Sequence, residues 1–567
     1  MAFPFRCKNA VCPLLALGTI LSLSAAQAES PNILGVLGDE MDRNFRVLKE
    51  KADPAPYFLA YAVADQDFAI VSGVFGSITT SNRARSSSLD VTVRVGSAKL
   101  DNYHRVRGDR AQFTGGAPVA IDGTPASLRK RVWLETDRTY RLAAERLIKI
   151  RTSSQVKVAE EDSSDDFSEE KPSVHSSPPA TLRFDAPAWE KRVRKLSGEF
   201  RKYPGILTCS VSVLGQAENK YFVNTEGTRI VHGRGFARVV ISAVARAADG
   251  MDLSTSETFE AVDPSGLPND REMLAAIERV AKDLTGLLKA PVVEPFVGPA
   301  ILSGRAAGVF FHEIFGHRIE GHRQKDETEG QTFTKSVNAA VLPDFLSVVF
   351  DPTQRKAAGI DLNGWYSFDD EGIAARRVPL SENGILKTFL MSRSPIRGFD
   401  HSNGHGRRQS GAEVVSRQSN LFVESSRKVS DAKLREMLIA EVKRQNKPYG
   451  LYFQNITGGF TTTSRGGLQA FKVIPLVVYR VYTDGRPDEL VRGAEMVGTP
   501  LASFGKIMAT SDKADVFNGY CGAESGSVPV SAISPALLVS EIEVEKKQKS
   551  QDRPPLLPMP GTGESGQ

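Results

Sequence analysis

The sequence is poor in cysteine, and it has no long apolar run beyond its first residues. Only four cysteines occur among 567 residues, which excludes a small scaffold held by many disulfides. After residue 28, no stretch approaches the roughly 18 to 20 consecutive apolar residues that a membrane-spanning helix needs. No Gly-x-Ser-x-Gly elbow and no phosphate-binding loop occur, so serine hydrolases of that kind and nucleotide-binding enzymes have little support.

The chain also lacks a strong excess of one charge. Its formal net charge is +5, and it falls to +3 if the first 28 residues, which carry Arg6 and Lys8 but no acid, are removed. So small an excess does not indicate a nucleic-acid partner.

The first 28 residues resemble a cleavable secretory signal. A basic start is followed by the uncharged apolar run 10–25 and by the small residues Ala26-Gln27-Ala28, the pattern of a cleavage site. We therefore expect cleavage after Ala28 and a periplasmic or secreted protein. A membrane anchor is the alternative, although the run is short for a span. The mature chain would keep only Cys209 and Cys521, and one disulfide between them stays open.

Periodicity predicts an α+β fold. Apolar residues recur at helical spacing in four segments and alternate or cluster in others. We expect an N-terminal domain of helices and antiparallel sheet over residues 29–290, a C-terminal, mainly antiparallel β domain over 291–545 that carries the metal site, and a Pro/Gly-rich disordered tail over 546–567. The expected helices are 33–51, 125–150, 189–200 and 271–288, and the expected strands are 57–65, 68–80, 89–95, 206–213, 221–224, 229–247, 299–302, 385–390, 473–482 and 536–544.

Residues 159–180 interrupt this pattern with acidic, Ser and Pro residues. Such a composition buries little apolar area, which predicts a mobile loop inserted into the N-terminal domain. A calcium site is the alternative, but the glycine of an EF-hand loop is missing.

The most informative segment is 308–322, which holds three of the eight histidines behind an apolar run. His312 and His317 flank Glu313, and the second histidine follows the first by five residues. On a regular helix a five-residue step turns a side chain by about 140°, whereas a four-residue step leaves it within about 40°. Both imidazoles can face one ion only if the helix ends or bulges between them. Gly316 permits this, since glycine accepts the positive φ that closes a helix.

This arrangement predicts a zinc site with its own general base. Neutral imidazoles suit Zn²⁺, and a catalytic zinc commonly has three protein ligands. Glu313 would remove a proton from water at the metal. The third ligand remains open among His322, Glu320, Asp369 and Cys521. The alternative is that the imidazoles are hydrogen-bonded histidines without a metal.

Five further motifs follow the two histidines along the chain. They are Glu320-Gly321, Asp369-Asp370-Glu371-Gly372, Glu382-Asn383-Gly384-Ile385-Leu386, Gly406-Arg407-Arg408, and Cys521-Gly522 before Ser527-Val528-Pro529-Val530. Together with His-Glu-x-x-x-His, they resemble the TldD-type, metal-binding branch of the TldD/PmbA family of zinc metallopeptidases. The resemblance is specific over about residues 295–545 and weaker over 30–290. A signal peptide and an acidic insertion would make this chain a secreted variant.

The resemblance implies that Cys521 is the third zinc ligand, in which case it would not be free to pair with Cys209. It also implies a peptidase that cleaves unfolded or flexible peptides, as a homodimer or a heterodimer with a family paralogue. One alternative is an amidase or maturation factor acting on one modified peptide. Another is a non-catalytic scaffold or maturation subunit of such a complex, although the scaffold branch lacks the histidine motif.

Five other residues are candidates for orienting the ligands or contacting the substrate. Glu320 and His322 follow the motif directly, and His322 stands where the family usually has Asp. Asp369 begins an acidic run that would orient a histidine or a loop, bind a second cation, or form a polar turn. Arg407 and Arg408 would hold a peptide carboxylate or lie in a solvated loop.

Overall fold

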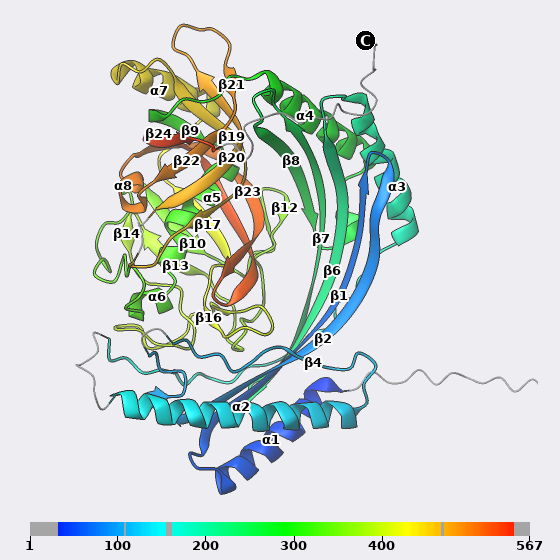
Figure 1. Ribbon diagram of the computed structural model, residues 1–567. Coiled ribbons are helices and arrows are strands. Elements are labelled where there is room, and N and C mark those ends of the chain that lie inside the picture. Colours follow the sequence, from blue (N-terminus) through cyan, green and yellow to red (C-terminus); the bar gives the residue numbers. More distant parts are fainter. Residues whose placement is uncertain (1–31, 107–108, 155–161, 467–469, 549–567) are drawn as a thin grey trace, which may run out of the picture.

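The computed structural model describes residues 32–106, 109–154, 162–466 and 470–548 (Figure 1). The predicted signal sequence and most of the predicted tail lie outside these ranges. Two large sheets dominate the molecule: a long curved sheet from the N-terminal half and a compact β domain beside it. Within the described ranges, no helix combines the length and the apolar character required to cross a membrane.

The first sheet has eight strands in the order β3-β2-β1-β6-β7-β5, with β4 paired to β2 and β8 paired to β7. Its long strands are antiparallel neighbours, as the alternating pattern predicts. The strands are β1 Pro56–Val74, β2 Ser77–Ser97, β3 Leu100–Asp101, β4 Ala117–Pro118, β5 Val174–Ser176, β6 Thr208–Asn224, β7 Arg229–Arg246 and β8 Asp252–Ala261.

These strands are longer than predicted. The expected strands 57–65 and 68–80 form the single strand β1 up to Val74, and 206–213 and 221–224 are joined in β6. The polar residues at the expected breaks are satisfied across the sheet: Gln66 Nε2 donates to Glu218 at 3.1 Å, and Asp67 pairs with Arg83 at 2.7 Å. Cross-strand pairing therefore carries the ladder through residues that would otherwise favour a turn.

Four helices cover the sheet at its two ends (Figure 1). At one end α1 Ile33–Lys51 and α2 Pro125–Ser154 pack their apolar faces on β1 and β2. At the other end α3 Ala186–Gly198 and α4 Asp270–Lys289 enclose a core with β6 to β8. All four helices are confirmed where helical periodicity predicts them. A short 3₁₀ turn, Glu199–Lys202, extends α3.

The acidic segment differs from its prediction over its described part. Phe167 is buried, with the guanidinium carbons of Arg94 and Arg393 at 3.7 Å and 4.0 Å from its ring centre. Asp166 lies 2.8 Å from the imidazole of His104. Residues 166–168 are therefore buried, which the composition of the predicted loop does not indicate. The acidic side chains there are matched by basic groups of both domains, which composition alone does not reveal.

The second sheet has twelve strands, and β9 pairs with both β19 and β24, which closes a ring of five strands with β20 and β22. Two small hairpins lie outside it. The strands of this half are β9 Phe296–Leu302, β10 Leu346–Phe350, β11 Lys356–Ala357, β12 Ile360–Asp361, β13 Val378–Glu382, β14 Ile385–Leu386, β15 Gly406–Arg407, β16 Val415–Ser416, β17 Asn420–Ser425, β18 Lys428–Val429, β19 Gly450–Thr461, β20 Phe471–Val481, β21 Glu489–Val491, β22 Ala494–Gly498, β23 Ile507–Ala523 and β24 Gly526–Lys546.

The C-terminal half is mainly antiparallel β, as predicted, and besides the expected helix that carries His312 it contains helices that the sequence pattern did not reveal. The clearest is α7 Asp431–Arg444, which begins at the N-cap Ser430. The expected strand 385–390 is limited to two residues. The remaining helices are α5 Gly304–Ile314, η3 Gly316–Arg318, α6 His322–Lys325 and α8 Pro500–Phe504. Of these, α5 packs most extensively on β24, β19 and β23, and it carries His312.

Candidate metal centre

Helix α5 is held in place by its apolar surface. Ser303 caps its start by accepting a hydrogen bond from the Ala306 amide. Phe310 and Phe311 are fully buried in the core of the second sheet, so the C-terminal turn of the helix has little freedom. The helix ends at Ile314, and the 3₁₀ turn η3 follows at once. The predicted interruption between His312 and His317 is therefore confirmed.

The predicted reason for Gly316 is wrong. Gly316 lies in a right-handed 3₁₀ turn and is not among the glycines with positive φ. A Cβ at this position would instead lie 2.0 Å from Oε1 of Gln418. The Gln418 side chain, rather than a left-handed backbone, therefore packs against this glycine and would have to shift to admit a Cβ. The same Gln418 donates to the carbonyl oxygen of His312 at 3.2 Å.

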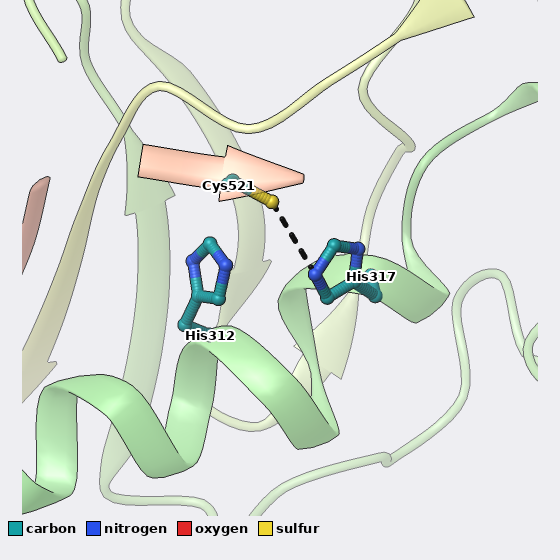
Figure 2. A group of neighbouring side chains, drawn as sticks. All are labelled: His312, His317 and Cys521. Carbon is teal, nitrogen blue, oxygen red and sulfur yellow. Dashed lines mark hydrogen bonds between the residues drawn. The ribbon is translucent and has the colours of Figure 1, made fainter. Parts of the chain in front are cut away.

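His312, His317 and Cys521 converge on one point (Figure 2). One potential ligand atom from each lies within 4.8 Å of the others. Sγ of Cys521 is 3.4 Å from Nε2 of His317, and the two imidazole centres are 5.0 Å apart. A tetrahedral zinc with ordinary Zn–S and Zn–N bonds separates sulfur and nitrogen by about 3.6 Å. The donor set and its spacing therefore fit a zinc ion.

Cys521 reaches this point from the hairpin of β23 and β24. It pairs with Val528 in the ladder, and Gly526, which begins β24 directly after the turn, has φ 79°. Arg417 Nη2 donates to the Cys521 carbonyl at 2.6 Å. Both Cys521 and Cys209 are free thiols. The disulfide alternative is therefore contradicted, and Cys209 lies buried in the separate core of the first sheet.

The charges of the cluster favour the thiolate. Burial raises the pKa of the Cys521 thiol, but His317 and His312 lower it more strongly, to well below its usual value. Burial lowers the pKa of His317, whereas Cys521 and Glu320 raise it well above its usual value. The thiolate is the form of cysteine that binds metals.

Glu313 lies beside the cluster, with Oε2 at 3.9 Å from Nε2 of His317. Burial raises the pKa of its carboxyl, and the two histidines oppose this rise. A raised carboxyl pKa suits a group that both takes and returns a proton near neutral pH. Gly459 of β19 packs so closely that an added Cβ would lie 2.8 Å from Cγ of Glu313.

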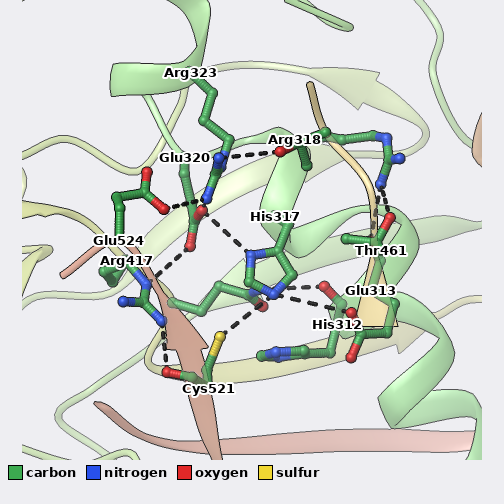
Figure 3. Close-up of polar contacts among 12 residues, drawn as sticks. His312, Glu313, His317, Arg318, Glu320, Arg323, Arg417, Thr461, Cys521 and Glu524 are labelled. Atoms are coloured by element: carbon green, nitrogen blue, oxygen red, sulfur yellow. Dashed lines mark hydrogen bonds and ion pairs between the residues drawn. The ribbon is translucent and has the colours of Figure 1, made fainter. Parts of the chain in front are cut away.

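Glu320 holds His317 from the other side (Figure 3). Its Oε2 lies 3.4 Å from Nδ1 of His317 and accepts from Nε of Arg323 at 2.8 Å, while Oε1 lies 3.5 Å from Nε of Arg417. Burial alone would raise the pKa of Glu320, but His317 and Arg323 lower it to about 2. An ionised carboxylate at Nδ1 directs Nε2 toward Cys521 and fixes the ring.

His322 lies near the cluster but outside it. Its side chain is buried, and its Nε2 pairs with Oε1 of Glu524. Glu524 also accepts from Nη2 of Arg323 at 2.9 Å. His322 thus belongs to a charged network behind Glu320, and the structure does not bring it to the three converging atoms. A surface position, the alternative to a role at the site, is excluded by its burial.

Asp369, Arg407 and Arg408 do not join the cluster either. They line a cavity of about 260 Å³ between the first sheet and the C-terminal domain, apart from the cluster. We call it the second cavity. Asp369 accepts from the backbone amides of Glu371, Ile373 and Gly406, so it forms a polar turn. Arg407 donates to two backbone carbonyls, and Arg408 lies 3.7 Å from Asp90. The expected solvated loop is wrong for both arginines, because they are buried.

Sequence reasoning missed several residues that hold the cluster. They come from distant segments and share no local pattern. They are Arg323 and Glu524 behind Glu320, Arg417 and Gln418 before β17, and Thr461 at the end of β19. The Thr461 hydroxyl accepts a hydrogen bond from Arg318 at 2.8 Å. Arg323 and Glu524 lie near recognisable motifs and could have been noticed by charge. Arg417 and Gln418 carry no such signal.

Two imidazoles, a thiolate and a raised-pKa carboxyl in one cleft of an α+β fold define a candidate metal-dependent hydrolase. Residues 297–546 match the model of the PmbA/TldA metallopeptidase C-terminal domain. This match and the curated relatives support membership of the chain in the TldD/PmbA family.

Curated relatives carry metalloprotease names. A metalloprotease of Methanocaldococcus jannaschii is 27% identical over 332 residues, 57% of this chain and 67% of that protein. The metalloprotease TldD homolog of Haemophilus influenzae is 28% identical, covering 60% of this chain and 68% of its own. The zinc metalloprotease TldD homolog of Saccharolobus solfataricus is 25% identical, covering 60% and 72%. These names support a peptidase role.

A solved structure shares the fold. TldE from Thermococcus kodakarensis aligns with 90% of this chain and 99% of its own, with a TM-score of 0.61 at 14% identity. At this identity the likeness establishes the α+β fold alone, with its N-terminal helix-and-sheet region and its C-terminal β domain.

Proposed function

We propose that the chain is a zinc-dependent peptidase in which His312, His317 and Cys521 hold the ion and Glu313 is the general base. The observation that carries this proposal is the convergence of the three donor atoms within 4.8 Å beside the Glu313 carboxylate. Folding does not require two imidazole nitrogens and a sulfur to converge on one point, so their convergence supports a metal site.

Each residue then has a defined task. Bound Zn²⁺ supplies a Lewis acid that polarises a carbonyl and lowers the pKa of water from about 15.7 to about 7. Glu313 takes a proton from the attacking water and returns it to the leaving amine. Glu320 keeps His317 in the orientation that its ligand role requires. Arg318 Nη1 donates to the Glu313 backbone carbonyl at 3.0 Å, which steadies the base.

An extended peptide is the substrate that the cleft favours. Residues 456–461 of β19 pair with β20 on one side, while none of the described strands pairs with their other edge. These residues line the cleft next to His312 and Glu313. An unfolded peptide could add to this edge as a further strand. Phe460 and Tyr520, which are 55% and 47% exposed at the same cleft, offer apolar contacts.

The location and assembly of the protein are part of the proposal. A signal sequence over residues 1–28 would direct the chain to the periplasm or the medium, where free Cys209 and Cys521 would need protection from oxidation. Zinc held by Cys521 and burial of Cys209 would provide it. Pairing with a second copy or a family paralogue is expected from the family resemblance.

Metal content and turnover of an unfolded peptide test the function together. The purified protein should hold about one zinc per chain by atomic emission and cleave an unstructured fluorogenic peptide. Glu313→Gln should keep the zinc but lose activity by about 10² to 10⁴. A wild-type protein without zinc binding, or a Glu313→Gln variant of equal activity, would contradict the proposal. Zinc binding without turnover would favour the scaffold alternative.

A further inference from the structure

The cleft extends from the cluster along helix α5, away from His317. This part is a cavity of about 350 Å³, within the range of small-ligand and short-peptide sites. Its walls come from α5, β19, β23 and β24 and, across the cavity, from β7 and β8 of the first sheet. His312 and Glu313 line it near the end of α5, and Arg305 lines it near the beginning.

Arg305 is a cation without an acidic partner among the described residues. Its Nη1 donates to the Val516 carbonyl at 3.0 Å, and its guanidinium lies 5.4 Å from the centre of the Phe517 ring. No other hydrogen bond to the described residues involves its side chain, which leaves four of the five guanidinium N–H groups available.

The other arginine of this cavity is neutralised. Nε of Arg238 pairs with Glu260 at 3.1 Å, and its Nη2 donates to the Asn518 carbonyl at 3.0 Å. Arg305 is therefore the cation of this cavity that is available to a ligand. A guanidinium with free donors binds a carboxylate with two parallel hydrogen bonds.

The position of Arg305 relative to the cluster sets the length of the ligand. Seven residues separate it from His312 on the same helix. Seven residues turn a helix almost two full times, so both side chains lie on one face, about 10 Å apart along the axis. An extended peptide advances about 3.3 Å per residue. About three residues would therefore span from the cluster to Arg305.

We propose that Arg305 binds a substrate carboxylate about three residues from the bond that is cleaved, and so determines which bond of a peptide is cut. The inference rests on the proposed peptidase function and adds the substrate class: peptides with a carboxylate at that distance. A free C-terminus and an Asp or Glu side chain present the same chemistry to Arg305.

Binding tests this without turnover. The probe is an N-terminally labelled, unstructured octapeptide, made as free acid, as C-terminal amide, and as amide with one internal Asp. Zinc-loaded Glu313→Gln protein should bind the free acid or the Asp peptide at least about fivefold more tightly than the plain amide. The preferred peptide identifies the source of the carboxylate. Adding Arg305→Gln should abolish the preference, Arg305→Lys should keep part of it, and the distant control Arg435→Gln should keep all of it.

Cleavage supplies the second readout. Mass spectrometry of the products should place the cut about three residues from the preferred carboxylate for wild type and for Arg435→Gln, and Arg305→Gln should raise KM more than it lowers kcat. Equal binding of all three peptides by the Arg305-containing protein, or a preference that survives in Arg305→Gln, would overturn the inference. A zinc-loaded wild type that cleaves nothing overturns the peptidase function instead, and the binding comparison still decides the role of Arg305.

Discussion

Two regions of this molecule bury ionisable side chains, and they do so in different ways. In the second cavity the ionisable groups are held by separate partners: Lys220 pairs with Asp370 at 2.6 Å, and Asp369 accepts hydrogen bonds from three backbone amides. In the cluster, His312, His317 and Cys521 point at one another, and their closest atoms are all potential metal donors. Burial of charge is thus common to both regions, but only the cluster directs several donors to one point.

The largest expected effect is a loss of bound zinc when a residue of the cluster is replaced. Cys521→Ser removes one of the three proposed ligands, so zinc affinity should fall strongly and peptidase activity should drop at least about a thousandfold. Zinc stoichiometry and kcat/KM measure this. Cys209→Ser, a buried thiol in the other core, is the matched control and should change neither. Equal zinc content in Cys521→Ser would place the metal elsewhere.

Acid should lower the stability of the protein through His232, which lines the second cavity. Burial, assisted by Lys220, lowers its pKa to about 4, although Asp370 and Glu218 oppose this. The unfolded chain binds a proton near pH 6.5, so the free energy of unfolding falls as pH drops from about 6.5 to about 4, by up to about 3 kcal/mol. No such loss occurs above pH 7. Urea unfolding at about pH 7 and pH 4.5 measures it.

His232→Gln should reduce that loss between the two pH values, whatever its effect at neutral pH. An unchanged pH dependence would show that other groups, such as buried His405 with a pKa lowered by burial to about 3, dominate the acid response.

A matched pair of carboxylate substitutions compares the regions directly. Glu320→Gln removes the charge at Nδ1 of His317 and should lower zinc affinity about 10- to 100-fold. Asp369→Asn alters a polar turn, so it should lower the unfolding free energy and leave zinc affinity unchanged. Competition with a fluorescent chelator and urea unfolding measure the two effects. If both variants lost zinc alike, the two regions would be one site.

The smallest effect concerns the packing that orients His317. Gly316→Ala introduces a Cβ against the Gln418 oxygen and should cost about 1 to 2 kcal/mol of stability, with a modest loss of zinc affinity. Gln418→Ala in the same chain should restore part of the stability, because the clashing oxygen is gone. Thermal unfolding of the two single variants and the double variant measures the coupling. Additive effects would contradict the proposed contact.

Patterns within a segment were predictable, and contacts between segments were not. The helices over 33–51 and 271–288 follow from apolar spacing, and the end of α5 between the histidines follows from their five-residue step. The cross-strand pair of Gln66 in β1 with Glu218 depends on β6, more than a hundred residues away. Arg417, which contacts both Glu320 and the Cys521 carbonyl, was invisible for the same reason.

Gly316, before His317, is a clear example of a contact between distant segments that the sequence did not reveal. A positive φ is a local reason for glycine, and it was the one that a single segment could suggest. The actual neighbour, Gln418, is about a hundred residues distant in sequence. Likewise, the composition of residues 159–180 predicted a mobile loop because the basic partners of Asp166, His104 and Lys325, lie elsewhere in the chain.

His317 and Cys521 stand 204 residues apart in the chain. An ion bound by both would act as a removable cross-link that closes a loop spanning most of the C-terminal domain, and closing so long a loop lowers the conformational entropy of the unfolded chain. Stability of this half of the protein would then depend on the free zinc concentration around it. When zinc is scarce, the chain would lose its activity and would also unfold and be degraded more readily.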